Sequence, residues 1–502
     1  MRTKLNLTIL MLFISLFLLG SRFLTKEESD ALQEALSIIN CKTEDLSFDK
    51  CWGEGEFLLE PVRETLDNPL SLPEISFKLM KNLTANPVQS SKTAREILNF
   101  KTSNPRLRKR TGFNLNNSDK FISELKQILE AAEKICGTPE FSMEQKELFF
   151  NSFLGENDST SDTIKNFNRL SLTDIFLLFE SFYPALETIQ PGDPLSSISA
   201  EYIDEKFWII VGNPGNHEYI IGTHPYEIII DFAGDDVYTF SDNPFINSFH
   251  LIIDISGNDK YLGSEKRGPG SGLLGIGIVM DLEGNDEYHG NDFCFGAAIG
   301  GVGILIDAGG TDKYYCNDFC LGAGYFGLGL LFDINGDDLY ESSRFSQGFA
   351  SVKGIGVLSD REGNDIYITG RRVLHQPLYN DHYQSLSQGF SIGMRSEGFA
   401  GGIGLIHDKE GNDKYIGDVY AQGAGYWYSL GILIDEGGED VYSAWIYGQG
   451  AGIHLASGCL IDLNGNDSYT LNDGVGQGGG HDLAIGFLLD RSGNDYYSGS
   501  GI

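Results

Sequence analysis

Ten pairs of aspartates recur at a fixed spacing in the second half of the chain. Each first Asp is followed by Gly three residues on, a second Asp five on and Tyr seven on, as in D-x-x-G-N-D-x-Y. Carboxylate oxygens are the ligands that hard cations such as Ca²⁺ prefer, and they also accept hydrogen bonds from the N–H groups of tight turns. The pairs therefore favour either a row of cation sites or a row of hydrogen-bonded turns.

The copies begin at Asp231, Asp254, Asp281, Asp307, Asp333, Asp360, Asp408, Asp435, Asp462 and Asp490. The residues predicted to bind metal are the pairs from the second copy onward: Asp254, Asp259, Asp281, Asp286, Asp307, Asp312, Asp333, Asp338, Asp360, Asp365, Asp408, Asp413, Asp435, Asp440, Asp462, Asp467, Asp490 and Asp495. An eleventh, degenerate copy at 212–219 has His217 in place of the second Asp.

The steps between successive first Asp residues are 23, 27, 26, 26, 27, 48, 27, 27 and 28 residues. A fixed period of this length indicates a stacked repeat architecture. Each unit holds short apolar runs bounded by glycine, such as GIGIVMD before an Asp, and later units add a Gln-Gly pair. The pattern predicts an all-β parallel β-helix, a β-solenoid of about 27 residues per coil and about 11 coils.

Stacking of such coils places the first Asp residues in one column, the second in another, and the tyrosines in a third. At the spacing between neighbouring strands, about 4.8 Å, two carboxylates repel by about 0.9 kcal/mol even in bulk water. A bound cation or a set of hydrogen bonds must offset this repulsion.

The turn GNDKY at 257–261 and its copies GNDEY at 284–288 and GNDYY at 493–497 resemble the G-G-x-G-x-D turn of the RTX, or hemolysin-type, calcium-binding proteins. The resemblance covers one five-residue turn per coil, and the period here is longer than in that family. It implies a β-helix whose aspartates bind calcium. The alternative, in which each Asp only accepts hydrogen bonds from its turn, stays open.

The acidity of the chain belongs to the repeats. Residues 201–502 hold 43 acidic and 14 basic residues, whereas residues 1–200 hold 28 and 22. A surface this negative repels the phosphates of nucleic acids and anionic lipid headgroups, and it attracts cations. We therefore predict no nucleic-acid partner.

The N-terminus has the layout of an export signal. Arg2 and Lys4 precede an apolar run that ends near Leu19, and the small residues Gly20 and Ser21 follow. The run is short for a membrane-spanning helix. We predict a signal peptide over residues 1–21, no membrane span after its cleavage, and an exported protein of the periplasm, cell surface or extracellular space. An uncleaved membrane anchor is the alternative.

Residues 22–198 predict an α-helical domain, followed by a linker over 199–206 and the solenoid over 207–502. Apolar residues from Phe121 to Ile135 recur at helical spacing, with Ser118 as the expected N-cap and Gly137 as the stop.

An insertion over 371–395 lies in the 48-residue step. It contains Arg371, His375, Asp381, His382, Tyr383 and Arg395. These residue types can act as base, acid and carboxylate clamp in polysaccharide cleavage, and loops that break a regular stack often carry function. They have no defined catalytic spacing, so a surface loop without catalysis is the competing interpretation.

Cys294 and Cys320 each follow a repeat Tyr by six residues, so stacking should place one above the other. A disulfide between them and a stacked pair of buried thiols both fit this arrangement.

These features predict an exported acidic solenoid that acts as a structural, adhesion or ligand-binding protein at the cell envelope, with calcium as cofactor and carbohydrate or another envelope protein as partner. The alternative is a carbohydrate-active β-helix enzyme, of lyase or hydrolase type, that uses the insertion. An open groove in which Arg371, His382 and Arg395 converge would favour the enzyme, and a splayed loop would favour the scaffold.

Overall fold

A computed structural model describes most of the chain from residue 23 to residue 499. The residues outside the description are 1–22, 47–54, 155–159, 191, 194–198, 213, 244, 377 and 500–502. The predicted signal peptide, residues 1–21, lies outside the described residues.

The N-terminal part of the described chain is helical. Its α-helices are α2 Lys26–Ile38, α3 Glu60–Asp67, α4 Leu72–Leu83, α5 Pro87–Leu98, α6 Ser118–Cys136, α7 Met143–Leu154, α8 Thr160–Phe167 and α9 Thr173–Leu186. Helix α6 ends before Gly137, as predicted, but its N-cap lies one residue earlier than predicted. The side chain of Asn117, in an extended conformation, accepts a hydrogen bond from the N–H of Lys120 at 2.8 Å.

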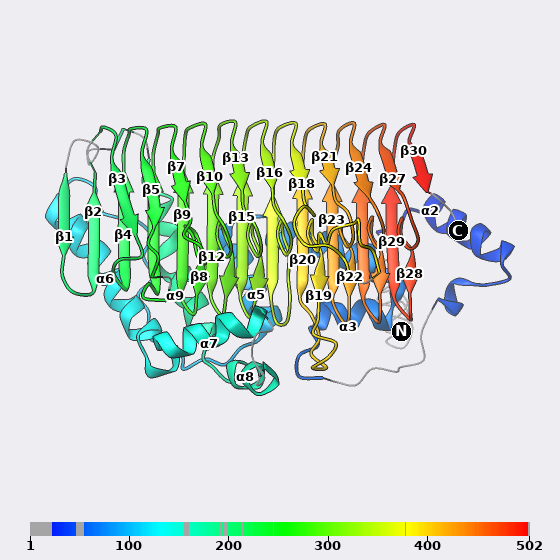
Figure 1. The fold of residues 1–502 in the computed structure, drawn as a ribbon, viewed down its shortest axis with the longest axis horizontal. Coiled ribbons are helices and arrows are strands. Elements are labelled where there is room, and N and C mark those ends of the chain that lie inside the picture. Colours follow the sequence, from blue (N-terminus) through cyan, green and yellow to red (C-terminus); the bar gives the residue numbers. More distant parts are fainter. Residues whose placement is uncertain are drawn as a thin grey trace, which may run out of the picture.

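The remainder is a β-solenoid of about ten turns, which confirms the predicted fold class (Figure 1). Each regular turn contributes a long strand that ends at the first Asp of a repeat, a short strand that contains the repeat Tyr, and a two-residue strand near the glycine-rich corner. Apart from the antiparallel pair β1 and β2, neighbouring strands pair in parallel.

The strands form three stacked sheets. The long strands are β1 Ala200–Ile203, β2 Phe207–Val211, β4 Tyr226–Asp231, β6 Phe249–Asp254, β9 Ile276–Asp281, β12 Val302–Asp307, β15 Leu328–Asp333, β17 Ile355–Ser359, β20 Ile403–Asp408, β23 Leu430–Asp435, β26 Ser457–Asp462 and β29 Ile485–Asp490. The tyrosine-bearing strands are β3 Glu218–Ile221, β5 Val237–Phe240, β7 Lys260–Leu262, β10 Glu287–His289, β13 Lys313–Tyr315, β16 Leu339–Glu341, β18 Ile366–Ile368, β21 Lys414–Ile416, β24 Val441–Ala444, β27 Ser468–Leu471 and β30 Tyr496–Gly499. The third sheet consists of β8 Gly272–Leu273, β11 Ala298–Ile299 and β14 Gly324–Tyr325, then β19 Ser391–Ile392, β22 Gly425–Tyr426, β25 Gly452–Ile453 and β28 Gly480–His481.

The register of the sheets aligns equivalent residues of successive repeats. Asp307 pairs with Asp281 on one side and Asp333 on the other, and Tyr314 pairs likewise with Tyr288 and Tyr340. The rings of Tyr314 and Tyr340 stack with centroids 4.8 Å apart and planes within 5°. The predicted vertical columns of Asp and Tyr are therefore present.

The helices cover the solenoid along its length (Figure 1). One apolar core contains residues of both parts, and the ring of Phe326 illustrates the contact: it lies against Phe57, Phe100 and Phe149 of the helical part. The long strands are buried on both faces because one side meets this core and the other meets a second core made by solenoid residues alone. Residues 199–206, which the sequence assigns to a linker, include strand β1, which pairs with β2.

The insertion at 371–395 forms two small loops that project from the stacked coils. Leu374 and Tyr383 form an antiparallel bridge in the first, and Met394 and Phe399 form one in the second. Between them Ser391 pairs with Gly425, so the stack continues beneath the insertion.

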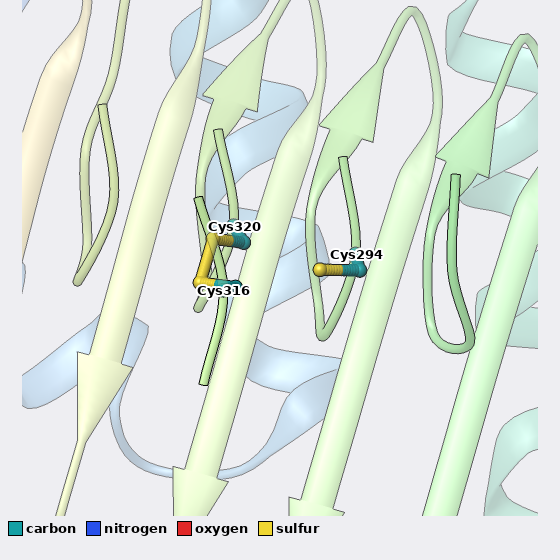
Figure 2. A group of neighbouring side chains, drawn as sticks. All are labelled: Cys294, Cys316 and Cys320. Carbon is teal, nitrogen blue, oxygen red and sulfur yellow. A yellow bond between two sulfur atoms is a disulfide. The ribbon is translucent and has the colours of Figure 1, made fainter. Parts of the chain in front are cut away.

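Cys294 and Cys320 stack on adjacent coils, as the spacing predicts, but no bond joins them. Cys320 instead forms a disulfide with Cys316, and the buried Cys294 thiol lies beside this pair (Figure 2). One sulfur atom of each residue lies within 4.8 Å of the other two. Only three residues lie between Cys316 and Cys320, so both lie in the same corner of one coil.

Across the described residues, the helices are too short or too polar to cross a bilayer.

Candidate metal centre

Nine first Asp residues, from Asp231 to Asp462, are buried, and each receives a hydrogen bond from the tyrosine of the preceding coil. The last one, Asp490, is partly exposed and accepts its hydrogen bond from Tyr497 of its own repeat. The hydroxyl of Tyr261 donates to Oδ2 of Asp281 at 2.6 Å, and the hydroxyl of Tyr367 donates to Oδ2 of Asp408 at 2.7 Å across the insertion. The tyrosine column therefore joins each coil to the next through the carboxylates, and it provides one hydrogen bond for one of the two oxygens.

The second Asp residues form a separate ladder. Oδ1 of Asp286 accepts a hydrogen bond from the backbone N–H of Asp259 at 2.6 Å, and Oδ1 of Asp259 accepts one from the N–H of Asp236 at 2.5 Å. The same contact repeats along the stack, and at the insertion it joins Asp365 to Asp413 at 2.6 Å. Each second Asp thus binds the coil before it through one oxygen.

The other oxygen of the second Asp has no hydrogen-bond partner among the described residues in nine coils. These oxygens are Oδ2 of Asp236, Asp259, Asp286, Asp312, Asp338, Asp365, Asp413, Asp440 and Asp467. Oδ1 of the first Asp is likewise unpartnered and buried in six copies, at Asp281, Asp333, Asp360, Asp408, Asp462 and Asp490. A buried, ionised carboxylate oxygen without a hydrogen-bond donor or a cation beside it is energetically costly. We therefore expect a bound ligand or a bound proton at these oxygens.

The aspartates of the two columns gather in groups of three residues. Asp259, Asp281 and Asp286 each place a carboxylate oxygen within 4.8 Å of the other two, and each side chain is at most 1% exposed. Asp236, Asp254 and Asp259 form the same triad one coil earlier. A triad therefore contains the second Asp of one coil and both Asp residues of the next, and neighbouring triads share a carboxylate.

The protein alone does not favour the charged form of these groups. Burial, reinforced by the neighbouring carboxylates, raises the pKa of Asp281 well above its usual range. Burial is also the largest cause that raises the pKa of Asp259 to about 9 and that of Asp286 to about 7. Either bound protons or bound cations must neutralise part of the column at neutral pH.

The competing interpretation, in which the turn N–H groups satisfy the carboxylates, holds for some copies. Oδ1 of Asp231, Asp254, Asp307 and Asp435 accepts a hydrogen bond from the N–H two residues on, at 2.9 to 3.1 Å. This interpretation does not account for the second Asp of each repeat, because its Oδ2 has no such donor among the described residues. Oxygen atoms in this number and proximity form a donor set that suits a hard cation such as Ca²⁺. Metal binding by the eighteen predicted aspartates stays a prediction.

The insertion residues separate into different places. Arg371 is exposed and forms an ion pair with Glu341 at 2.6 Å, and Asp381 is exposed. Arg395 lies over the ring of Trp427. The residues that would mark an open groove, Arg371, His382 and Arg395, therefore have different contact partners.

His382 and its neighbours form a compact polar group in the insertion. Nδ1 of His382 lies 2.9 Å from Oδ1 of Asp418, its ring stacks on Trp445 at 3.8 Å, and the N–H of Tyr383 donates to Oδ2 of Asp418 at 2.5 Å. The segments around His375 and His382 run antiparallel to each other, and the backbone N–H of His375 donates a hydrogen bond to the carbonyl of His382.

Aromatic rings extend from this group over the neighbouring coils. We call Tyr379, His382, Tyr420, Tyr426, Trp445 and Tyr447 the aromatic face. Tyr420 stacks on Tyr447 at 4.9 Å and meets Tyr426 edge-on at 5.9 Å, and the side chains of the face are partly exposed. The sequence did not single out Trp445 or this face, because its members come from three coils and share no motif; the only signal was their equivalent place in the repeat.

Comparisons with known proteins identify no relative: no family model, no curated protein and no solved structure matches the chain.

Proposed function

We propose that this chain is an exported structural or ligand-binding protein of the cell envelope, whose acidic solenoid is stabilised by calcium ions bound along the aspartate column. The observation that carries the proposal is the triad of Asp259, Asp281 and Asp286: three buried carboxylates, each with an oxygen that lacks a partner among the described residues. The export part rests on the N-terminal signal layout.

Calcium suits the triad better than a transition metal because the donors are all oxygen. The column is also a place where each bound ion offsets several repulsions at once, since neighbouring triads share a carboxylate. Ions in adjacent triads would themselves repel, so we expect fewer ions than triads. Ion binding to the folded chain and not to the unfolded chain raises the free energy of unfolding.

The test is a calcium titration of protein stripped with EDTA, followed by calorimetry and by circular dichroism melts. We expect calcium to bind with several ions per chain and to raise the melting temperature, and EDTA to lower it again. An Mg²⁺ titration under the same conditions is the control for non-specific screening, because Mg²⁺ demands near-octahedral geometry and keeps its waters. Equal melts in EDTA and calcium, with no binding heat, would refute the calcium proposal.

The ligand-binding role is supported by the aromatic face. The six side chains of the face are partly exposed, and the ring of Tyr420 stacks on that of Tyr447 at 4.9 Å. Partly exposed aromatic rings suit a ligand that has apolar faces beside its hydroxyl groups, as sugars do. The net charge of the repeats disfavours a polyanion, so we propose a neutral polysaccharide.

A second candidate function, polysaccharide cleavage, is favoured by the contact between His382 and Asp418. A carboxylate at Nδ1 orients the imidazole and leaves Nε2 as the base. The discriminating experiment measures both binding and chain cleavage of neutral polysaccharides by the wild type and by His382→Ala, with His289→Ala, an exposed histidine elsewhere on the solenoid, as control. Binding without cleavage supports the scaffold, and cleavage that only His382→Ala abolishes supports the enzyme.

A further inference from the structure

A corner of the last coils places two histidines and an aspartate together. The third-sheet strands β25 and β28 pair with Ile453 opposite His481, so the residues that follow, His454 and Asp482, occupy the same position in successive coils. The backbone confirms this register, because the N–H of His454 donates to the carbonyl of His481 at 2.9 Å.

The same corner position is apolar or glycine in earlier coils. Leu274, Gly300 and Phe326 hold it there, following the aligned strands β8, β11 and β14, and Phe326 is buried against the helices. The change to His454 and Asp482 brings polar side chains to a position that elsewhere supports packing. Structural repetition therefore does not require these residues.

The three side chains already approach the spacing of metal ligands. Nδ1 of His454 lies 2.8 Å from Oδ2 of Asp482, and Nε2 of His481 lies 3.6 Å from the same oxygen. One ligand atom of each residue lies within 4.8 Å of the other two. Two ligands at bonds of about 2.0 Å around a tetrahedral ion lie about 3.3 Å apart, which the two measured separations bracket.

From this geometry we propose that His454, His481 and Asp482 form a second metal site, distinct from the aspartate column and selective for a borderline divalent ion such as Zn²⁺ or Co²⁺. Two imidazole nitrogens and one carboxylate suit these ions, whereas calcium prefers oxygen ligands. Three protein ligands leave at least one coordination position for water or an external ligand.

The position of the group allows an ion to enter. The exposed fractions of the side chains are 18% for His454, 41% for His481 and 62% for Asp482. The ring of Tyr426 meets His454 edge-on with centroids 5.1 Å apart, which restrains the orientation of that imidazole. The site is thus partly ordered on one side and open on the other. It also adjoins the aromatic face through Tyr426.

The test is a Co²⁺ titration of the full chain without reductant, monitored by calorimetry and by the visible spectrum of the bound ion. Excess Ca²⁺ is present throughout to occupy the aspartate column, so the outcome does not depend on the calcium proposal. The variants are His454→Ala, His481→Ala and Asp482→Asn, with His289→Ala as the matched control. Asp482→Asn changes an exposed side chain and leaves the fold intact, so it reports on the site even where a histidine variant unfolds.

We expect one Co²⁺ to bind per chain with nitrogen and oxygen ligation, and each of the three variants to weaken binding by at least about tenfold, whereas His289→Ala leaves it unchanged. The proposal fails if wild-type protein binds no Co²⁺, or if all three variants bind as tightly as the wild type. It also fails if the spectrum shows thiolate ligation, because the ion would then lie at a free cysteine such as Cys294 and not at the proposed site.

Discussion

Asp337 and Asp338 are consecutive residues of one turn that differ in their surroundings, so they allow a matched test of the aspartate column. Asp338 is buried: Oδ1 accepts a hydrogen bond from the N–H of Asp312 at 2.6 Å and Oδ2 has no partner among the described residues. Asp337 is exposed and accepts hydrogen bonds from the backbone and side chain of Asn364 at 2.8 and 2.9 Å. Asp338→Asn and Asp337→Asn remove the same charge with the same change of shape.

The expected effect of Asp338→Asn has opposite signs with and without calcium. Two carboxylate charges 4.8 Å apart, the largest separation of the oxygens within a triad, repel by about 0.9 kcal/mol in water and by about 3.5 kcal/mol at an effective dielectric constant of 20. In EDTA at about pH 9, above the pKa of Asp338, which burial raises to about 8, the variant is therefore more stable by about 1 to 3 kcal/mol. With calcium at 100 times its Kd it instead loses up to about 2.7 kcal/mol of ligand stabilisation.

The assay is urea unfolding followed by circular dichroism, in EDTA and in calcium, for the wild type and both variants. Asp337→Asn should stay within about 0.5 kcal/mol of the wild type in both conditions, because the asparagine oxygen can keep accepting the contacts from Asn364. Calcium coordination by the column is refuted if Asp338→Asn and Asp337→Asn respond alike to calcium. The repulsion argument is refuted if Asp338→Asn destabilises the protein in EDTA.

Three further predictions concern the same architecture. Burial raises the pKa of Asp259 to about 9 and that of Asp286 to about 7, so above about pH 4 the folded, metal-free chain binds more protons than the unfolded chain. The urea midpoint of unfolding in EDTA should therefore fall as the pH rises from about 5 to 9. Saturating calcium should remove this pH dependence because the ion needs deprotonated ligands. Tyr367→Phe removes the hydroxyl that donates to Asp408 and should cost about 1–3 kcal/mol by urea unfolding, and an unchanged midpoint would show that the tyrosine column does not stabilise the coils. Phe326→Ala opens the core shared by the helices and the solenoid and should cost about 3–5 kcal/mol, measured in the same way, whereas a loss below about 1 kcal/mol would mean that the helical layer is only loosely attached.

The columns of the solenoid could be predicted because they follow from one quantity, the period. A step near 27 residues makes the first Asp, the second Asp and the Tyr each fall above its equivalent, whatever the detailed path of the chain between them. The stacking of Tyr314 on Tyr340 and the pairing of Asp307 with Asp333 are direct results of that period.

Features that depend on the path between repeats were not predictable in this way. The spacing placed Cys294 above Cys320 correctly, but the partner of Cys320 was decided within its own corner, where Cys316 lies closer along the chain. The contact between His382 and Asp418 required knowing how the insertion folds back over the next coil. Likewise, amphipathic spacing located helix α6 without showing that the helices lie along the solenoid, since the spacing identifies an apolar face but not the surface that covers it.

The arrangement of carboxylate oxygens in the column implies that protons and calcium ions compete for the same oxygens. A proton satisfies one oxygen of one carboxyl, whereas a cation satisfies one oxygen from each member of a triad such as Asp259, Asp281 and Asp286. Under the calcium proposal, the same orphaned oxygens bind protons when calcium is scarce and calcium when it is abundant, so we expect each bound ion to release protons. Calcium titrations at two buffers of different ionisation enthalpy would measure that release, and binding without any proton release near pH 7 would show that the column is already charged, contrary to the effect expected from its burial.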